Sequence, residues 1–409
     1  MKFCIVNAYG RSNRGDSVLL DECISEIRAY DNEAKISCAL FYGVDEALSV
    51  YPDINWSIRI GNSRTKGILG RIETISYMMI ALLSTVKCFS FLISILPKDQ
   101  QTTFLSIRNV DVVVSAPGGY IHDTNFAYYV ALLHIYLGIL MKKKVILAPQ
   151  SYGPIQSKFG RWIASHVLSK CNAVCSRELY SHNFLANELS VPNGVLRRCG
   201  DSAFFNYREN SNFPNVSDEY KKILFGEQRI LGITVVGWSF PHRKNAAEDY
   251  ERYVTAFARA VDEIAFRHNL KPVVFNQVDG DMSTARILQS KCKSEVYVDS
   301  VSREPELLRP LISRSFVFVG TRFHSCIFAM MEGVPTMAIS YLPKTEFIMK
   351  DIGFSDKYVD INSVDVDKIV KCVSWDVENP EEARLILSEK LKLYRDKFGR
   401  LSDVFLEEV

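Results

Sequence analysis

The sequence predicts an α/β protein with two domains, each built on a parallel β-sheet that helices cover on both faces. With 409 residues the chain is longer than one ordinary core requires, which suggests two domains of roughly 200 residues each. Short Val- and Ile-rich segments alternate with stretches of helical apolar spacing, a pattern typical of strands buried on both faces. A polar stretch at residues 207–228 interrupts this alternation and is predicted to be the linker.

The first domain, residues 1–206, is expected to alternate strands with helices, apart from an apolar insertion at about residues 65–100. Its expected strands lie at residues 3–8, 34–42, 111–117, 143–150 and 172–178. Its expected helices lie at residues 18–30, 126–141, 162–169 and 179–189. Asp16 and Ser17 are the two side chains suited to cap the first of these helices.

The second domain, residues 229–409, repeats this alternation. Its expected strands lie at residues 229–238, 271–277, 295–300, 315–320 and 334–340. A helix at 246–268 follows the first strand, and a final helix at about 380–398 is expected to cross back over the first domain. The whole is therefore predicted to be two Rossmann-like domains in a GT-B-like arrangement with an interdomain cleft. Active residues of such sheets usually lie in loops at the carboxyl ends of the strands.

Composition excludes several classes of protein. The formal charge of +2 is spread without long runs of one sign, so no basic face for nucleic acid is expected. The ten cysteines form no CxxC pair, so we expect no metal site and a reducing compartment. The amino terminus reads as a strand rather than an export signal, so we expect a cytoplasmic protein.

An apolar segment at residues 76–96 qualifies that expectation and leaves three interpretations open: a helix pair partly buried in the protein, an interfacial contact with the inner face of the cell membrane, or a true span. A span would place Lys87 at its centre, at a cost of about 2.5–3.5 kcal/mol on insertion scales. Arg64, Lys66 and Arg71 precede the segment, a flank typical of segments that lie on anionic lipid. Residues 126–141 are shorter and are predicted to be a buried core helix.

The strongest candidate site lies between a buried strand that ends at Gly320 and the apolar helix that follows. Arg322 and His324 fall between them, and their alternate spacing in an extended loop would let both face one side. Backbone N–H groups at the helix start would add an anion site. An arginine grips phosphate or carboxylate, and a histidine exchanges protons near neutral pH. The alternative is that Arg322 binds a local carboxylate and His324 packs against the helix.

Loops of the first domain supply further candidates. Residues 9–17 offer Asn13, Arg14 and Asp16 after the first strand, and the alternative there is a turn capped by Asp16. The other three candidate positions each follow a later strand: Gly118 with Gly119, Gln150, and Arg177. Tight packing and a surface salt bridge are the ordinary explanations for the glycines and for Arg177. Because several such loops converge on one sheet edge, a polar pocket is expected there.

Taken together, these residues resemble the polysaccharide pyruvyl transferase family, in order along nearly the whole chain. The matching motifs lie at residues 13–19, 118–119, 150–154, 176–178, 200–204, 322–325 and 333–335, with Tyr341 and Lys344 after them. The RFHS motif at 322–325 and the apolar helix behind it are the most specific part. One departure is Tyr120, where the family often has a third glycine. This difference bears on which acceptor sugar is used more than on the reaction.

The resemblance implies a transferase of cell-surface polysaccharide biosynthesis, such as that of exopolysaccharide or capsule. It would move the pyruvyl group of phosphoenolpyruvate onto two hydroxyls of a sugar or lipid-linked oligosaccharide, forming a cyclic ketal with no cofactor and no metal. It implies that His324 transfers a proton and that Arg322 and Arg177 hold the donor. Ser325, Lys344 and the first-domain candidates would complete the substrate site, with the acceptor on the first domain and the donor on the second.

Two other functions remain open at this point. A GT-B glycosyltransferase would use a nucleotide-sugar, with Glu332 as the carboxylate for ribose hydroxyls. A non-enzymatic scaffold of envelope assembly would use residues 76–96 as its docking surface. The compact Arg-x-His pair favours a small anionic donor over both of them.

Overall fold

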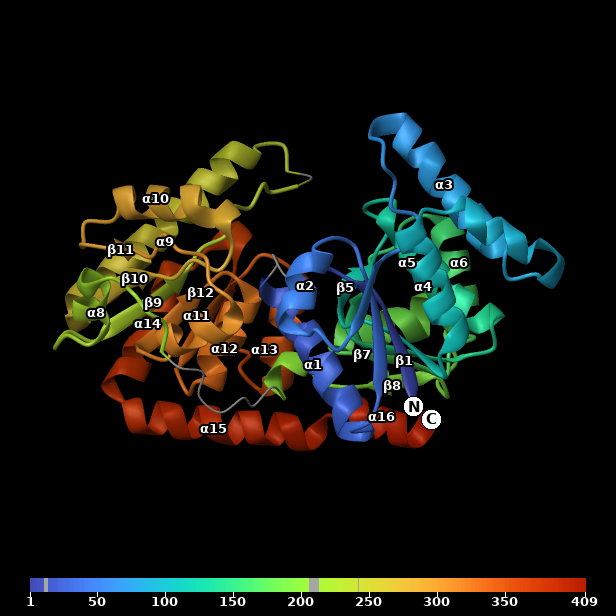
Figure 1. The fold of residues 1–409 in the computed structure, drawn as a ribbon. Helices are drawn as coiled ribbons and strands as arrows, with labels where there is room; N and C mark the ends of the chain where they lie inside the picture. Colours follow the sequence, from blue (N-terminus) through green and yellow to red (C-terminus); the bar gives the residue numbers. More distant parts are fainter. Residues whose placement is uncertain (11–13, 206–212, 242) are drawn as a thin grey trace. The chain divides into compact units, whose positions relative to one another are not determined.

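The computed structural model describes residues 1–10, 14–205, 213–241 and 243–409, apart from the side chains of Arg14, Asp16 and Pro305. The chain divides into two compact units. Unit 1 comprises Met1–Phe205 together with Phe398–Val409, and unit 2 comprises Asn206–Lys397 (Figure 1). Each unit is built on one sheet of parallel strands.

The sheet of unit 1 has the order β3-β2-β1-β4-β6-β7-β8, with β5 paired to β6. Its strands are β1 (Lys2–Ala8), β2 (Lys35–Leu40), β3 (Asn55–Ile58), β4 (Val112–Ser115), β5 (Gly118–Ile121), β6 (Lys144–Tyr152), β7 (Ala173–Ser176) and β8 (Leu196–Arg198). Because all of these pairings are parallel, the carboxyl ends of the strands share one edge.

Helices cover both faces of this sheet. The helices of unit 1 are α1 (Arg14–Tyr30), α2 (Val44–Val50), α3 (Gly67–Leu83), α4 (Lys98–Asn109), α5 (Ala127–Leu140), α6 (Lys158–Leu168), α7 (Leu179–Asn183) and α16 (Leu401–Glu408). Successive β1 residues point to opposite faces, so Phe3 and Ile5 join the core under α1 and α16, while Cys4 and Val6 join the core under α4 and α5. Helix α5 is buried along most of its length, which confirms the core helix predicted at 126–141.

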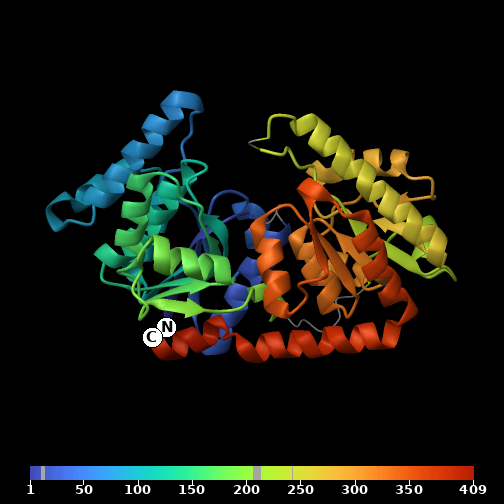
Figure 2. The same ribbon diagram turned by 180° about the vertical axis from the view of Figure 1, so that it is seen from behind.

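The carboxyl-terminal segment differs from the expectation. The predicted crossing helix at 380–398 is α15 (Pro380–Lys397), which belongs to unit 2, while α16 returns to unit 1. Phe405 of α16 packs against Phe3 and Tyr30, with ring centroids 5.6 Å away in each pair. Because Phe405 covers apolar residues of β1 and α1, the last helix completes the first core, and the two chain termini lie close together (Figures 1 and 2).

An ion pair fixes this returning segment. Arg400 donates from Nε to Glu26 Oε1 over 2.8 Å, and the amide of Ser402 donates to Glu26 Oε2 over 2.9 Å. We expect Arg400→Ala to lower the thermal midpoint by several degrees, because it leaves the buried Glu22 and Glu26 carboxylates with less compensation. Differential scanning fluorimetry measures this. The exposed pair of Arg28 with Asp53 is the control, and an equal shift in Arg28→Ala would contradict the expectation.

Unit 2 has a six-stranded sheet in the order β11-β10-β9-β12-β13-β14. Its strands are β9 (Ile230–Thr234), β10 (Lys271–Val274), β11 (Tyr297–Val298), β12 (Ser315–Gly320), β13 (Thr336–Ser340) and β14 (Tyr358–Asp360). Its helices are α8 (Asp218–Leu224), α9 (Ala246–His268), α10 (Met282–Lys291), α11 (Pro305–Ile312), α12 (Phe323–Met331), α13 (Pro343–Ile352), α14 (Val366–Glu378) and α15. The expected linker at 207–228 is wrong in its second half, because α8 lies there and buries Tyr220 and Leu224 within unit 2.

The apolar segment at 76–96 forms the second half of α3 and the 3₁₀ helix η1 (Lys87–Ile95). One side of α3 packs on the core under α4 and α5 through Tyr77, Met78 and Ile80. Throughout the part of the chain that the structure describes, no helix combines the length and apolar character needed to cross a bilayer. Of the three interpretations, the true span therefore finds no support among these residues.

Candidate functional site

The sequence Gly320–Thr321–Arg322 leads from the carboxyl end of β12 directly into α12. Arg322 is the N-cap of this helix, and His324 is its second residue. The extended loop predicted for these two residues is therefore wrong, because Phe323, which lies between them, is already the first residue of the helix. Both residues nevertheless lie at one helix start, where backbone N–H groups have no partner within the helix.

The guanidinium of Arg322 is held by a carboxylate that the sequence did not single out. Nε donates to Asp281 Oδ2 over 2.5 Å, and Nη2 donates to Asp281 Oδ1 over 2.6 Å. The same Oδ1 accepts the amide of Gly237 over 2.8 Å. Asp281 is buried, so this fork fixes the orientation of Arg322. The alternative in which Arg322 binds a local carboxylate is thus realised, and the Nη1 edge of the guanidinium is left to other groups.

Two aromatic residues flank the fork. Tyr341 follows β13 and lies 5.0 Å from Trp238, centroid to centroid, in an edge-to-face arrangement. Burial by itself lowers the pKa of the Arg322 guanidinium, but the hydrogen bonds and charge of Asp281 and the hydroxyl of Tyr341 raise it above its ordinary value. Arg322 therefore remains a cation beside a polar hydroxyl and an aromatic wall.

His324 and Lys344, the other predicted residues near the start of α12, both lie beside aromatic rings. His324 is half-buried between Phe323 and Phe328, with ring centroids 5.3 and 6.5 Å away. Lys344, in the first turn of α13, places Nζ 5.4 Å from the centroid of the Phe323 ring. The start of α12 thus gathers Arg322, His324 and Lys344, a set with two cations and one titratable imidazole.

Ser325 has a different role from the one predicted. It is fully buried, and its hydroxyl lies 2.7 Å from Thr234 Oγ1 and 2.7 Å from the carbonyl oxygen of Arg322. A side chain in that position ties α12 to β9 and positions Arg322. We therefore assign Ser325 to positioning rather than to substrate contact.

Two buried amides at the same sheet edge were missed by sequence reasoning. Asn276 and Gln277 follow β10 and are about 5% and 4% exposed. Asn276 Nδ2 and Gln277 Oε1 have no hydrogen-bond partner among the described residues. Buried polar atoms in that state are costly unless a ligand or water satisfies them, so they are candidate ligand contacts. These two residues could have been found from the sequence, because two amides directly after a buried strand are unusual in a core.

In unit 1, Arg177 is enclosed instead of open to a ligand. It is 1% exposed, donates from Nε to Ser151 Oγ over 2.9 Å, and pairs through Nη1 with Asp201 over 3.0 Å. Glu178 lies 3.4 Å from the same guanidinium, and burial raises the pKa of its carboxyl above the ordinary value although Arg177 opposes this. The surface salt bridge considered for Arg177 is wrong, and a direct grip on the donor is not what this geometry favours.

The glycines and Gln150 surround this buried network. A Cβ on Gly119 would lie 3.7 Å from Arg177 Nη2, and one on Gly118 would lie 3.1 Å from the Tyr120 ring. Gln150 is fully buried, and neither end of its amide has a hydrogen-bond partner among the described residues. Gly119 is the exposed member of the group and the one that a substrate can reach.

Three predicted residues of the first loop cannot be placed. Asn13 lies outside the described residues. The backbone of Arg14 and Asp16 forms the first turn of α1, but their side chains are outside the described part.

A basic residue of the same edge was not predicted. Arg59 follows β3 and stacks on Phe41, with its guanidinium carbon 3.7 Å from the ring centroid. Burial lowers its pKa to about 10. No carboxylate pairs with it among the residues that the structure describes, so it is a candidate for binding an anionic group. No three His, Cys, Asp or Glu side chains gather in a metal-binding arrangement within the same residues.

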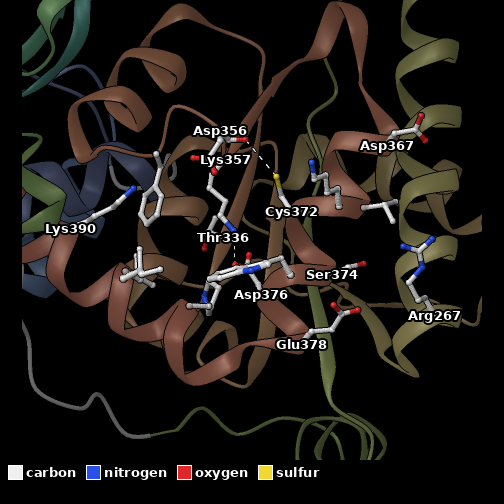
Figure 3. Close-up of a pocket in the computed structure, with 18 of the residues that line it drawn as sticks. Arg267, Thr336, Asp356, Lys357, Asp367, Cys372, Ser374, Asp376, Glu378 and Lys390 are labelled. Carbon is white, nitrogen blue, oxygen red and sulfur yellow. Dashed lines mark hydrogen bonds and ion pairs between the residues drawn. The ribbon is translucent and has the colours of Figure 1, made fainter.

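A pocket of about 880 Å³ in unit 2 lies at the wrong edge of the sheet for this chemistry (Figure 3). It is bordered by Thr336, the first residue of β13, and by Lys357, which precedes β14. Lys357 Nζ donates to Asp376 Oδ1 over 2.5 Å within it. Because β12, β13 and β14 are parallel and Arg322 follows the carboxyl end of β12, Arg322 lies at the opposite edge of the sheet from this pocket, which is not part of the candidate site.

Comparison with known proteins decides the family. The family model of polysaccharide pyruvyl transferases matches residues 13–343, which include Arg322, His324 and Asp281. The chain belongs to the polysaccharide pyruvyl transferase family. Its relatives include the amylovoran biosynthesis protein AmsJ of Erwinia amylovora, 21% identical over 412 residues that cover 96% of this chain and 97% of AmsJ. The predicted family and a transferase activity are thereby confirmed.

Solved structures confirm the predicted fold class. HepE of Anabaena, solved with UDP and glucose, superposes with a TM-score of 0.60 at 11% identity and covers 97% of this chain and 95% of its own. A UDP-GlcNAc 2-epimerase of Neisseria meningitidis bound to UDP-GlcNAc gives 0.60 at 14% identity, covering 100% and 99%. These likenesses show that the pyruvyl transferase has a GT-B-like α/β fold; at such identities they show the fold alone.

The carboxylate expected for a nucleotide-sugar site is misplaced for that role. Glu332 is the C-cap of α12, at the opposite end of the helix from Arg322, about 15 Å along its axis. It pairs with Arg309 at 2.7 Å. Glu332 is therefore far from Arg322 and His324, which disfavours it as the ribose carboxylate of the alternative nucleotide-sugar site.

The buried carboxylate of Asp281 gives a testable expectation. We expect Asp281→Asn to lower kcat/KM by about tenfold to a hundredfold, because the amide keeps the shape but loses the charged fork that orients Arg322. Steady-state kinetics with phosphoenolpyruvate measures the loss, and Asp281→Glu should recover part of it. Asp279→Asn, an exposed change in the same turn, is the control. Equal activity of Asp281→Asn and Asp279→Asn would overturn this role.

Proposed function

We propose that this polysaccharide pyruvyl transferase moves the pyruvyl group of phosphoenolpyruvate onto two hydroxyls of a sugar, forming a cyclic ketal during cell-surface polysaccharide synthesis. The observation that carries the proposal is the Arg322–Asp281 fork at the start of α12, with His324 and Lys344 beside it. No cofactor is needed in this scheme, since phosphoenolpyruvate is itself the activated co-substrate.

The donor carries a phosphate and a carboxylate on a small frame, so its site needs more than one cationic group. Arg322 supplies one cation, oriented by Asp281, and Lys344 adds an ammonium above the Phe323 ring. Backbone N–H groups of the first turn of α12 provide further donors. This arrangement replaces the pair of Arg322 with Arg177 expected from the sequence, because Arg177 is already enclosed by carboxylates.

The chemistry follows from these groups. His324 donates a proton to the methylene carbon of phosphoenolpyruvate, which becomes a methyl group, and the positive charge develops on the neighbouring C2. One sugar hydroxyl attacks C2 and loses its proton. That hydroxyl proton returns to His324. The C2–O bond to phosphate then breaks, its electron pair leaving with inorganic phosphate, and the second hydroxyl attacks C2 to close the ketal, its proton passing to the released phosphate. Proton transfer of this kind typically contributes about 10²–10⁴-fold.

The unit 1 edge supplies groups suited to the acceptor. Gly119 is exposed beside the Arg177 network, and Arg59 is a cation with no carboxylate partner among the described residues. An acceptor sugar that carries a phosphate or a carboxylate would suit Arg59. The predicted roles of Asn13, Arg14 and Asp16 in acceptor binding stay predictions.

The test is product analysis. Purified enzyme is incubated with phosphoenolpyruvate and a panel of oligosaccharides, and released phosphate is compared with ketal formed, detected by mass spectrometry. The proposal predicts one phosphate for each ketal. Phosphate release with free pyruvate and no ketal for any acceptor would argue against it, as would sugar transfer from a UDP-sugar under the same conditions.

A further inference from the structure

The outer side of α3 and η1 is an apolar surface that nothing in the described part of unit 1 covers. Its side chains are each at least 41% exposed: Ile68, Leu69, Ile72, Ile75, Met79, Leu83, Val86, Phe89, Phe91 and Ile95. We call these ten residues the α3 surface. Ile68, Ile72, Ile75, Met79 and Leu83 recur every three or four residues, so they form one stripe along about 22 Å of helix. Contiguous exposed apolar surface of this kind marks an interaction site.

The opposite side of α3 is firmly packed, so the stripe is not the product of a loose helix. Gly70, Thr74 and Ala81 are buried there, and Thr74 Oγ1 donates to the carbonyl oxygen of Gly61 over 3.1 Å. Figures 1 and 2 both show α3 at the periphery of unit 1, with one side towards α5 and the other facing away. Ile93 of η1 packs inward and does not belong to the surface.

The charges around the α3 surface are almost all positive. Arg64, Lys66, Arg71, Lys87 and Lys98 are exposed, and none of them forms an ion pair among the residues that the structure describes. The acidic residues of this stretch are Asp99, next to Lys98, and Glu73, whose carboxylate accepts from Tyr77 and from the amides of Arg64 and Thr65. Glu73 has these hydrogen bonds within the protein. These hydrogen bonds, that of Tyr77 first, lower its pKa to about 2.

We propose that the α3 surface docks unit 1 onto an anionic lipid bilayer, with the apolar stripe in the interface and the basic residues at the headgroups. The positive charge around the α3 surface favours an anionic bilayer over a second copy of the chain as the binding partner. A symmetric dimer through the α3 surface would bring two sets of five cations together, and like charges across an interface are costly. An anionic bilayer instead buries the apolar stripe and places negative headgroups beside the five basic residues.

The position of α3 connects this docking to the proposed function, on which the following step rests. The loop before α3 follows the carboxyl end of β3, so it leaves the same sheet edge that carries Gly119 and Arg59. A bilayer bound to the α3 surface would therefore lie beside the acceptor edge of unit 1. The acceptor class that this favours is a sugar linked to a membrane lipid.

The experiment is vesicle co-sedimentation of the full chain. Vesicles of equal parts phosphatidylglycerol and phosphatidylcholine are compared with vesicles of phosphatidylcholine alone. We expect binding to the anionic vesicles only, weakened by salt. The triple variant Ile68→Ser, Ile72→Ser, Ile75→Ser should bind on the order of tenfold more weakly or less. Arg64→Gln with Lys66→Gln and Arg71→Gln should show a similar loss.

Matched controls lie in unit 2. Phe266→Ser, Leu385→Ser and Leu393→Ser remove equally exposed apolar residues and should leave vesicle binding unchanged. Arg322→Ala should also bind vesicles like the wild type, so failure of the pyruvyl-transfer proposal is distinguishable from failure of this one. Three results would overturn it: no binding to anionic vesicles, equal binding to both kinds, or unchanged binding by the triple serine variant. Self-association that this variant abolishes in sedimentation velocity would assign the α3 surface to a second copy instead.

Discussion

Arg322→Ala is expected to lower kcat/KM for phosphoenolpyruvate by about 10²–10³-fold, the loss typical of one preorganised charged donor. The physical reason is that Asp281 fixes the guanidinium through Nε and Nη2, so its positive charge is oriented before the donor binds. Arg322→Lys should recover little, because an ammonium cannot keep the two-point fork and still reach the donor. Steady-state kinetics over a range of phosphoenolpyruvate concentrations measures both variants.

A matched control is available in Arg309 of α11, which contacts the far end of α12. Arg309 pairs with Glu332 at the other end of α12, in a similarly shielded ion pair. We expect Arg309→Ala to alter stability but to leave KM for phosphoenolpyruvate close to that of the wild type. A comparable loss of kcat/KM in Arg309→Ala and Arg322→Ala would show that the effect comes from helix stability, not from donor binding.

His324→Ala is expected to lower kcat by about 10²–10⁴-fold while phosphoenolpyruvate binding is retained, because the imidazole acts in proton transfer rather than in holding the anion. His324 packs between Phe323 and Phe328 at the helix start, so its removal leaves Arg322 and Asp281 in place. Rapid-quench kinetics combined with equilibrium binding separates the two effects.

His268→Ala serves as the control for this prediction. His268 is at the end of α9 and hydrogen-bonds Ser374, away from the carboxyl edge of the sheet. Its removal should leave kcat unchanged. Near-normal turnover by folded His324→Ala would remove His324 from the proton-transfer role.

The fold was predictable where the pattern is local. The Val- and Ile-rich runs of β1, β4, β9 and β12 are buried on both faces, and their short length and content of β-branched residues identify such strands. The return of α16 to unit 1 was not predictable, because it depends on Phe405 covering Phe3, a contact about 400 residues apart in the sequence.

The same difference between local patterns and long-range contacts applies to the candidate site. Arg322 and His324 could be found because a buried strand leads directly into an apolar helix at that point. Asp281 could not, because its pairing with Arg322 spans 41 residues and joins two different loops. Arg177 was assigned to the donor because residue type does not reveal burial; only the structure shows that Asp201 and Glu178 enclose it.

The central claim is that the start of α12 binds phosphoenolpyruvate, and a calorimetric titration tests it most directly. Wild-type protein and Arg322→Ala are each titrated with phosphoenolpyruvate, UDP-glucose and UDP-GlcNAc. We predict saturable binding of phosphoenolpyruvate that Arg322→Ala loses, and no comparable binding of either UDP-sugar. Saturable binding of a UDP-sugar alone, with none of phosphoenolpyruvate, would contradict the claim and assign the protein to glycosyl transfer.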